Sequence, residues 1–367
     1  MPIYMDIHDV PGAEALDLAE AHRKDILIQD EYRCKCMTYW LDETRGNAFC
    51  LIEAPERSVV EEMHRKSHGF IPHKIIEVQN EVIESFLGRI RDPEKTKVSD
   101  TGLKVFSESA FRILLVIEMI DSILLVDKLG IPKAKDLHHK LSSSVKKQVS
   151  ALDGREAEHT GSGIIVSFSQ AAKAIECALN IQKDFSAAEK KSLGIKMGVS
   201  AGDPIAKSDK VFGDTIRLGK SLCTVYHPSG QIVVSTIVKK LVSGNFLQKN
   251  RKDILTLSAQ DETFLETVFD KLEKNWQDSD FNVLSFCQSM SMSKSQLYRK
   301  TVALWDMSPN LLLKEYRLDK ARELLRSQSY NISQTTFDSG FTSPSYFTKC
   351  FKKKFGLLPA NYLNSPH

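Results

Sequence analysis

The spacing of apolar side chains in residues 1–80 switches between two periods. Four segments carry apolar residues at every second position, which is the period of a half-buried strand: 3–8, 32–40, 47–53 and 74–78. Two further segments, 13–29 and 56–68, have the three- and four-residue spacing of an amphipathic helix. The order strand, helix, strand, strand, helix, strand predicts an α+β domain of the βαββαβ type.

A polar interval separates this pattern from the next one. Residues 92–102 are charged and poor in apolar side chains, so we predict a linker over 81–108. Strands and helices then alternate from 109 to 257, which predicts a second α+β domain. Its expected elements are a buried strand from residue 111, helices at 136–151 and 170–185, and strands at 164–168, 195–201 and 231–235.

Strand spacing disappears in the last segment, residues 259–367. This segment contains two copies of one design, a short helix, a tight turn and a second helix, at 283–299 and 332–354. Ser293 and Ser343 each precede the second helix of a copy and can cap it through the hydroxyl. In the second copy the spacing assigns four aromatic residues to the inner face of that helix: Tyr346, Phe347, Phe351 and Phe355.

A longer helix is predicted between the two copies, at residues 309–328. Pro309 stands near its start, and one apolar stripe runs along it through Leu311, Leu318, Ala321 and Leu325. Such a helix is about 30 Å long, close to one turn of B-DNA. It is therefore suited to hold two recognition helices in successive major grooves.

Local charge supports a nucleic-acid partner better than the net charge does. The formal charge of the 367-residue chain is only +3. Between residues 293 and 354, however, bases clearly outnumber acids, which is typical of a surface that contacts phosphates. The bases are Lys294, Arg299, Lys300, Lys314, Arg317, Lys320, Arg322, Arg326, Lys349, Lys352, Lys353 and Lys354.

The remaining composition is that of a soluble multidomain protein, with 42% hydrophobic and 26% charged residues. The most apolar stretch, 111–126, contains Glu118 and Asp121 and is too short for a bilayer, so no membrane partner is expected. The amino terminus lacks the basic and apolar regions of a secretory signal. Seven cysteines without a regular framework favour reduced thiols and a cytoplasmic location.

The last segment resembles the AraC family of transcriptional regulators. The residues that carry the resemblance are MSKSQLYRK, SP..L....RLDKARELL and GFTSPSYFTKCFKKKFGLLP. The resemblance implies DNA contacts from two recognition helices, with phosphates met by Lys352 to Lys354. The contacting residues would be Ser295, Tyr298, Arg299 and Lys300 in the first helix and Ser345, Thr348, Lys349, Lys352 and Lys353 in the second.

Two departures from the family pattern concern the second copy. Thr335-Thr336 stands where the family usually has Ile-Ala, and Leu363 replaces a common terminal arginine. The alternative to DNA binding is a helical bundle with an ordinary solvated basic face, but that alternative does not account for two units in the right order.

The middle segment resembles class III adenylyl and guanylyl cyclases. The resemblance rests on RILLVIEMIDSILLVDKLG, DGREAEHTGSGIIVSFSQAAKAIECALNIQ, IKMGVSAGDPI and VFGDTIRLGKSL...HPSGQIVVS. A cyclase needs two carboxylates for its metal pair, and these positions are Glu118 and Ser162, the latter in a Gly161-Ser162-Gly163 turn. The remaining polar positions of the mechanism are also changed, to Glu158, Arg217 and Ser221, so no catalysis is expected.

Two roles remain open for such a domain. One is a scaffold that keeps the fold in order to form a homodimer, which we favour. The other is a pocket that binds a nucleotide effector without turning it over, with Arg217 as a candidate phosphate contact.

The first segment resembles a family of small ferredoxin-like nickel-binding domains through YMDIHDVPG, AEAHRKD, TYWLDETRGNAFCLIEAP and HRKSHG..P..IIEV. Asp6 and His8 share one face of a strand, as do Cys34 and Cys36, while His64 and His68 lie one helical turn apart. Imidazole and thiolate suit nickel or another late first-row divalent metal. The candidate ligands are His8, His22, Cys36, His64 and His68. Taken singly, each is better explained as a core cysteine or a surface histidine; the cluster together with the resemblance is what points to a metal.

The expected fold class is therefore multidomain α+β, with a ferredoxin-like βαββαβ domain (1–80), a linker (81–108), a cyclase-like α+β domain (109–257) and an all-α double helix-turn-helix domain (259–367). The leading hypothesis is a transcriptional regulator, not an enzyme, that binds promoter DNA. Its first two domains are expected to sense a metal or nucleotide effector and to dimerise. Its rival is a class III nucleotide cyclase with a DNA-binding tail. A metal-storage protein would leave the two helix-turn-helix units unexplained.

Overall fold

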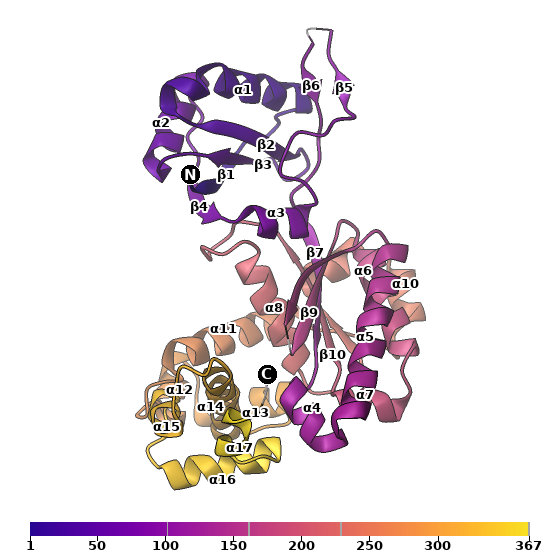
Figure 1. Cartoon of the computed structure of the whole chain (residues 1–367), viewed down its shortest axis with the longest axis vertical. Helices are drawn as coiled ribbons and strands as arrows, with labels where there is room; N and C mark the ends of the chain where they lie inside the picture. Colours follow the sequence, from indigo (N-terminus) through magenta and orange to yellow (C-terminus); the bar gives the residue numbers. More distant parts are fainter. Residues whose placement is uncertain (101, 161, 228–229, 366–367) are drawn as a thin grey trace.

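The computed structural model describes residues 1–100, 102–160, 162–227 and 230–365. Along the long axis of the molecule, the N-terminal sheet lies at one end, the larger middle sheet follows, and the C-terminal helices lie at the other end (Figure 1). The N-terminal and middle domains have apolar cores of their own, whereas the two clusters of the C-terminal domain also contain residues of the middle domain.

The N-terminal domain has the predicted order of elements: β1 (Ile3–Asp9), α1 (Ala15–Ile28), β2 (Lys35–Asp42), β3 (Asn47–Glu53), α2 (Arg57–Ser67) and β4 (Lys74–Val78). Its antiparallel sheet has the strand order β2-β3-β1-β4, which confirms the ferredoxin-like arrangement. A short 3-10 turn, Gln29–Tyr32, occupies the start of the predicted strand 32–40, so β2 begins three residues later.

The segment 81–108 is more ordered than the linker that its polarity predicts. It contains most of helix α3 (Asn80–Leu87) and an antiparallel pair, β5 (Lys97–Val98) and β6 (Lys104–Val105). Helix α3 buries Phe86 and Leu87 in a cluster that also contains Trp40 of the N-terminal sheet and Val116 of the middle sheet. The expectation of a linker is thus wrong for this helix, because its apolar face joins the two sheets.

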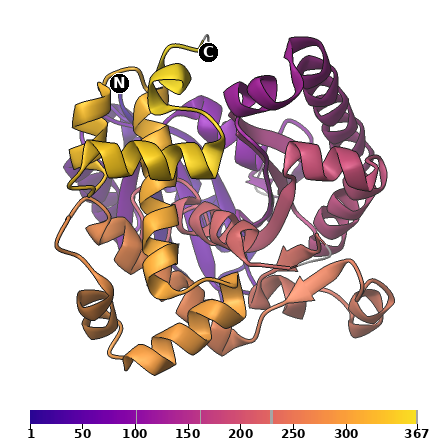
Figure 2. The ribbon, with the colours of Figure 1, turned by 90° about the horizontal axis from the view of Figure 1, so that it is seen from below.

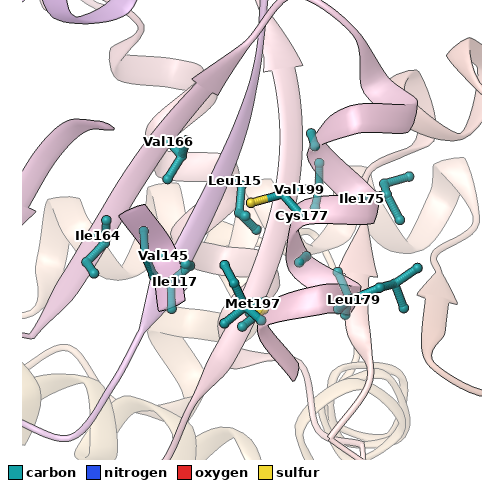
Figure 3. Packing of buried hydrophobic residues seen from close by; sticks show 14 of the residues in the cluster. Leu115, Ile117, Val145, Ile164, Val166, Ile175, Cys177, Leu179, Met197 and Val199 are labelled. Atoms are coloured by element: carbon teal, nitrogen blue, oxygen red, sulfur yellow. The ribbon is translucent and has the colours of Figure 1, made fainter. Parts of the chain in front are cut away.

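The middle domain is built on a six-stranded sheet with the order β12-β11-β10-β7-β9-β8. The strands are β7 (Arg112–Glu118), β8 (Arg155–Thr160), β9 (Gly163–Phe168), β10 (Lys196–Gly202), β11 (Ile232–Val234) and β12 (Ile254–Thr256). The helices are α4 (Ser122–Leu129), α5 (Ile131–Ala151), α6 (Ala171–Lys183), α7 (Ala187–Leu193), α8 (Gly213–Thr224), α9 (Thr236–Leu241) and α10 (Gly244–Lys249). On one face of the sheet, Leu115, Ile117 and Val199 pack against Val145 of α5 and Ile175 of α6 (Figure 3).

In its described part, residues 259–365, the C-terminal domain is built of helices. They are α11 (Ala259–Asn275), α12 (Val283–Ser289), α13 (Lys294–Trp305), α14 (Pro309–Arg326), α15 (Ile332–Asp338), α16 (Pro344–Phe355) and α17 (Pro359–Leu363). The hydroxyls of Ser293 and Ser343 cap α13 and α16 as predicted. Within the described ranges of the chain, no helix combines the length and apolar character needed to cross a membrane.

Candidate functional site

The two helix-turn-helix units are assembled on opposite halves of α14. Its first half contributes Leu312 and Leu313 to a cluster with Leu297 of α13, whereas its second half contributes Leu318 and Leu325 to another cluster. The second cluster includes Phe347 of α16. Seen from below, the yellow α16 and the orange α13 lie toward opposite ends of this helix (Figure 2). With 18 residues, α14 spans about 27 Å.

The turn of the second unit depends on Gly340. This residue has φ +73°, and a Cβ atom there would lie 2.4 Å from the carbonyl oxygen of Trp276. The turn of the first unit places Ser291 in the same left-handed region, with φ 52°. Both turns therefore bring two short helices close together, as helix-turn-helix units require.

The recognition helices expose most of the residues that were predicted to contact DNA. In α13, Ser295, Tyr298 and Arg299 are exposed, whereas Lys300 is partly buried with its ammonium 4.7 Å from the centre of the Phe264 ring. In α16 the exposed residues are Ser345, Lys349, Lys352 and Lys353, and Thr348 is partly buried. Each helix thus presents one polar, basic face to solvent.

Several bases of the predicted phosphate surface instead hold the domain together. Lys354 lies 3.0 Å from Glu315 and 2.8 Å from Asp319 on α14, so the expectation that it meets a phosphate is wrong. Arg317 donates to the Trp276 carbonyl, and Lys320 pairs with Glu273. Tyr346, predicted to face inward, is 53% exposed, because Phe341, Phe347 and Phe351 already fill the core of that unit.

The C-terminal domain also packs firmly on the middle domain. Helix α4 inserts Ile123 and Leu124 into the core of the second unit, and Arg326 pairs with the buried Asp121 at 3.0 Å. At the first unit, the indole Nε1 of Trp305 donates to the Thr224 hydroxyl at 2.9 Å. Any movement between sheet and recognition helices must disrupt these contacts.

A cavity of about 1130 Å³ lies where the three domains meet, and the cyclase-like positions open into it. Glu118, Glu158, Arg217 and Ser221 all line it, together with α3 on one side and α14 on another. Burial raises the pKa of Glu118, an effect that Lys220 and Arg322 partly offset. Gly161 lies outside the described residues. The Ser162 carbonyl accepts from the Met119 amide at 2.9 Å, and Gly163 begins β9 opposite Glu118.

Two of the polar side chains that line the cavity already have partners within the chain. Arg217 is paired with Asp214 at 2.9 Å, and the Ser221 hydroxyl donates to the Arg217 carbonyl at 2.9 Å.

The N-terminal domain holds a buried cluster of metal-ligating side chains between its sheet and its helices. One group combines Asp6 and His8 of β1, Cys50 of β3 and His64 of α2; a second combines Asp25 of α1 with His64 and His68. Within each group the possible ligand atoms all lie within 4.8 Å of one another. His64 is fully buried, and its two ring nitrogens face Asp6 and Asp25 at 2.9 and 3.2 Å.

In this cluster, burial and the neighbouring charges shift the pKa values of the side chains in opposite directions. Burial by itself would raise the pKa of Asp6 and of Asp25, but the neighbouring histidines hold both pKa values well below the usual range. For His64, burial lowers the pKa, yet Asp6 and Asp25 outweigh it and raise the pKa to about 10. Burial and the nearby Asp6 raise the pKa of the Cys50 thiol well above its usual value.

Three of the five predicted metal ligands, His8, His64 and His68, meet in the cluster. His22 instead pairs with Asp92 at 3.4 Å, and Cys36 belongs to neither group among the described residues. The predicted ligand set lacked Asp6, Asp25 and Cys50. Asp6 is paired with Cys50 across β1 and β3, a register that spacing along one strand does not reveal.

Comparisons with known proteins match both ends of the chain. Residues 286–365 match the family model described as Helix-turn-helix domain, and residues 4–78 match the one described as Nickel responsive protein SCO4226-like. Histidine kinase P4 of Formosa agariphila is 40% identical over 110 residues, which are 30% of this chain and 8% of that protein. Transcriptional activator AggR of Escherichia coli is 30% identical over 169 residues, 45% of this chain and 58% of that protein.

Solved structures also align with parts of the chain. SCO4226 from Streptomyces coelicolor A3(2) aligns over 21% of this chain and 94% of its own, with 27% identity and a TM-score of 0.20. A bacterial light-regulated adenylyl cyclase aligns over 66% of this chain and 87% of its own, with 13% identity and a TM-score of 0.30. The chain spans less than two thirds of the length of the two curated relatives named above.

Proposed function

We propose that this chain, which carries an AraC-type helix-turn-helix domain at one end and a SCO4226-like domain at the other, is a transcriptional regulator that binds promoter DNA. The observation that carries the proposal is the pair of recognition helices, α13 and α16, held on one rigid helix with exposed polar faces. Binding to promoter DNA would place the protein in the bacterial cytoplasm.

Specific contacts are assigned to the exposed residues of these helices. Arg299 and Lys349 are long, charged and free to reach a groove, whereas Lys300 is held against Phe264 and is better placed for a phosphate at the edge of the site. Exposed Lys352 and Lys353 continue the positive face of α16. Base contacts would supply sequence preference, and these phosphate contacts would supply much of the affinity.

The N-terminal domain would bind a late first-row divalent metal, nickel in the first place, as the effector. The ligand set fits such an ion, because imidazole, thiolate and carboxylate converge in a buried cluster. His8 is only 5% exposed, its Nε2 pairs with Asp6 at 3.2 Å, and its Nδ1 makes no hydrogen bond within the described structure. A bound metal would give this side chain the partner that burial otherwise denies it.

The middle domain would transmit the signal without turning over a nucleotide. It contacts α3 on one side and the DNA-binding domain on the other, so it lies between the metal cluster and the recognition helices. The cavity at the junction is large enough for a nucleotide, which stays a second candidate effector. A homodimer on a two-part operator is the proposed assembly.

The proposal is tested by mapping the genomic sites of the tagged full chain, with and without added nickel. Recurrent sites upstream of genes, sharing a sequence motif and changing in occupancy with nickel, are the expected result. A map without enriched sites in either condition would contradict DNA binding. Enriched sites with the same occupancy in both conditions would support DNA binding but contradict the proposal that nickel is the effector.

Coupling between metal and DNA has to be reciprocal. If nickel tightens operator binding tenfold, about 1.4 kcal/mol, then operator DNA must tighten nickel binding by the same factor. Calorimetric titration of nickel into the full chain, with and without operator DNA, measures both sides of this relation.

A further inference from the structure

The two groups of metal-ligating side chains in the N-terminal domain have one residue in common, His64. The first group is Asp6, His8, Cys50 and His64, and the second is Asp25, His64 and His68. Two groups that share a histidine need not compete for it, because an imidazole ring has two nitrogens on opposite sides.

His64 offers a different nitrogen to each group. Its Nε2 lies 2.9 Å from Asp6 Oδ2, whereas its Nδ1 lies 3.2 Å from Asp25 Oδ1 and 3.0 Å from His68 Nε2. The ring therefore stands between two sets of ligand atoms that approach it from opposite edges. Its position is enforced by burial, since the His64 side chain has no exposed surface.

The spacing of these atoms is that of ligands around a metal ion. With metal–ligand bonds of about 2.0–2.2 Å, neighbouring ligands of a tetrahedral or octahedral ion lie roughly 3 to 3.5 Å apart. In the first group His8 Nε2 is 3.2 Å from Asp6 Oδ1, and in the second His68 Nε2 is 3.3 Å from Asp25 Oδ1. These atoms are hydrogen-bonded or ion-paired to one another, and within each group all possible ligand atoms lie within 4.8 Å.

One ring nitrogen of His8 points to a ligand independently of these distances. The side chain is 5% exposed and its Nε2 pairs with Asp6, but its Nδ1 makes no hydrogen bond in the described structure. A buried imidazole nitrogen without a partner is costly unless something else occupies the site.

We propose that the N-terminal domain binds two late first-row divalent ions bridged by the imidazolate of His64. The first ion is held by Asp6, His8, Cys50 and His64 Nε2, and the second by Asp25, His68 and His64 Nδ1. The inference rests on the proposed metal-sensing function and specifies its site. On binding, the Cys50 thiol proton and the His64 ring protons pass to water.

Charge balance favours two ions over one. Asp6, Asp25, the Cys50 thiolate and the His64 imidazolate supply four negative charges, which two divalent cations neutralise in a buried site. The side chains of the second group are also buried, with His68 6% and Asp25 4% exposed, so its charge needs neutralising as much as that of the first.

The test is a titration of the tag-free full chain with Co²⁺ under anaerobic conditions. Bound metal is counted by elemental analysis after gel filtration, and the spin state is followed by electron paramagnetic resonance. The wild-type chain should bind two ions, and the signal of the one-ion form should weaken as the second ion binds, because a shared imidazolate couples the two spins.

Variants separate the two positions without relying on the fully buried His64. His68→Ala and Asp25→Asn should each bind one ion per chain and keep an uncoupled cobalt signal. His73→Ala is the matched control, since this histidine lies in the same domain, is 48% exposed and belongs to neither group; it should behave as the wild type.

Three other outcomes would contradict the imidazolate bridge, and each has a different meaning for the metal site. One ion per chain in both the wild type and His68→Ala removes the second ion but leaves the proposed metal sensor intact. Two ions with additive, uncoupled signals show separate sites that share no ligand. No cobalt bound at micromolar free concentration removes both the bridge and the metal-sensing function.

Discussion

Asp203 shows how one side chain can make the junction between two domains sensitive to pH. It lies near Arg45 and Asp42 of the N-terminal domain, and its Oδ1 makes no hydrogen bond within the described structure. Burial raises its pKa to about 6, which Arg45 only partly offsets. Because the folded-state pKa is raised, the carboxyl group favours folding below pH ~4, and this contribution is lost as the pH rises through about 6.

Replacing this carboxylate by a neutral amide should stabilise the protein at neutral pH. Asp203→Asn is expected to raise the free energy of unfolding at pH 7.5 by about 1 to 2 kcal/mol, with a smaller gain at pH 5. Denaturant titrations at the two pH values measure the difference. Glu94→Gln, an exposed carboxylate of the same junction region, is the control and should change neither value. An equal gain at both pH values would contradict the assignment.

Arg299 and Lys349 are the side chains on which DNA recognition should depend most. Arg299→Ala and Lys349→Ala are each expected to weaken operator binding by about 1 to 3 kcal/mol, because each removes a charged contact from an exposed recognition face. Fluorescence anisotropy with operator and scrambled DNA gives both the affinity and its sequence preference. Lys183→Ala, on the exposed surface of the middle domain, should have no effect. Unchanged affinity in both helix variants would remove α13 and α16 from the interface.

At the scale of elements, α14 and α4 together determine how the second helix-turn-helix unit is held. The second half of α14 packs with α16, and the same core receives Leu124 from α4 of the middle domain. Thr335 and Thr336, fully buried on α15, stand where aliphatic side chains would fill more space. This unit therefore relies on the middle domain for part of its apolar core.

Shortening Leu124 should loosen the second unit selectively. Leu124→Ala is expected to lower the local stability of α15–α17 by about 2 to 5 kcal/mol, because the side chain is 8% exposed and leaves a cavity. Hydrogen exchange measures this as faster exchange in residues 332–363, with α12 and α13 unchanged. Leu241→Ala, whose side chain is 45% exposed on α9, provides the comparison. Equal loss of protection in both units would mean that α4 supports the whole domain.

At the scale of the whole molecule, the cyclase-like sheet serves as the connection between the two ends of the chain. The positions that a cyclase would use line a cavity closed by α3 and α14 of this same chain. A ligand in this cavity would touch residues of all three domains.

The purified full chain with Mn²⁺ and ATP or GTP should form no cyclic nucleotide above background. Ser162 cannot replace the second metal-bridging carboxylate, and Arg217 is already paired with Asp214. Product formation is followed by chromatography, with Glu118→Ala as the control. Turnover that disappears in Glu118→Ala would instead support an active cyclase with a DNA-binding tail.

Local patterns in the sequence determined most of the secondary structure and the chemistry of each end. Strand and helix periods predicted the βαββαβ order, and the two helix-turn-helix units follow from apolar spacing and serine caps. These features depend on residues within a few positions of one another, so a single sequence contains them. His64 and His68 were found together for the same reason, since they lie one helical turn apart.

Only the tertiary structure decided the pairings between distant residues. Cys50 lies opposite Asp6 because of the register between two strands. Asp25 lies close to His64 because two helices pack together. Lys354 forms an ion pair with Glu315 on the neighbouring helix. Helix α3 became part of a core because two sheets meet on its apolar face. Such contacts depend on how elements separated by tens of residues pack, and no periodic pattern along the chain records that packing.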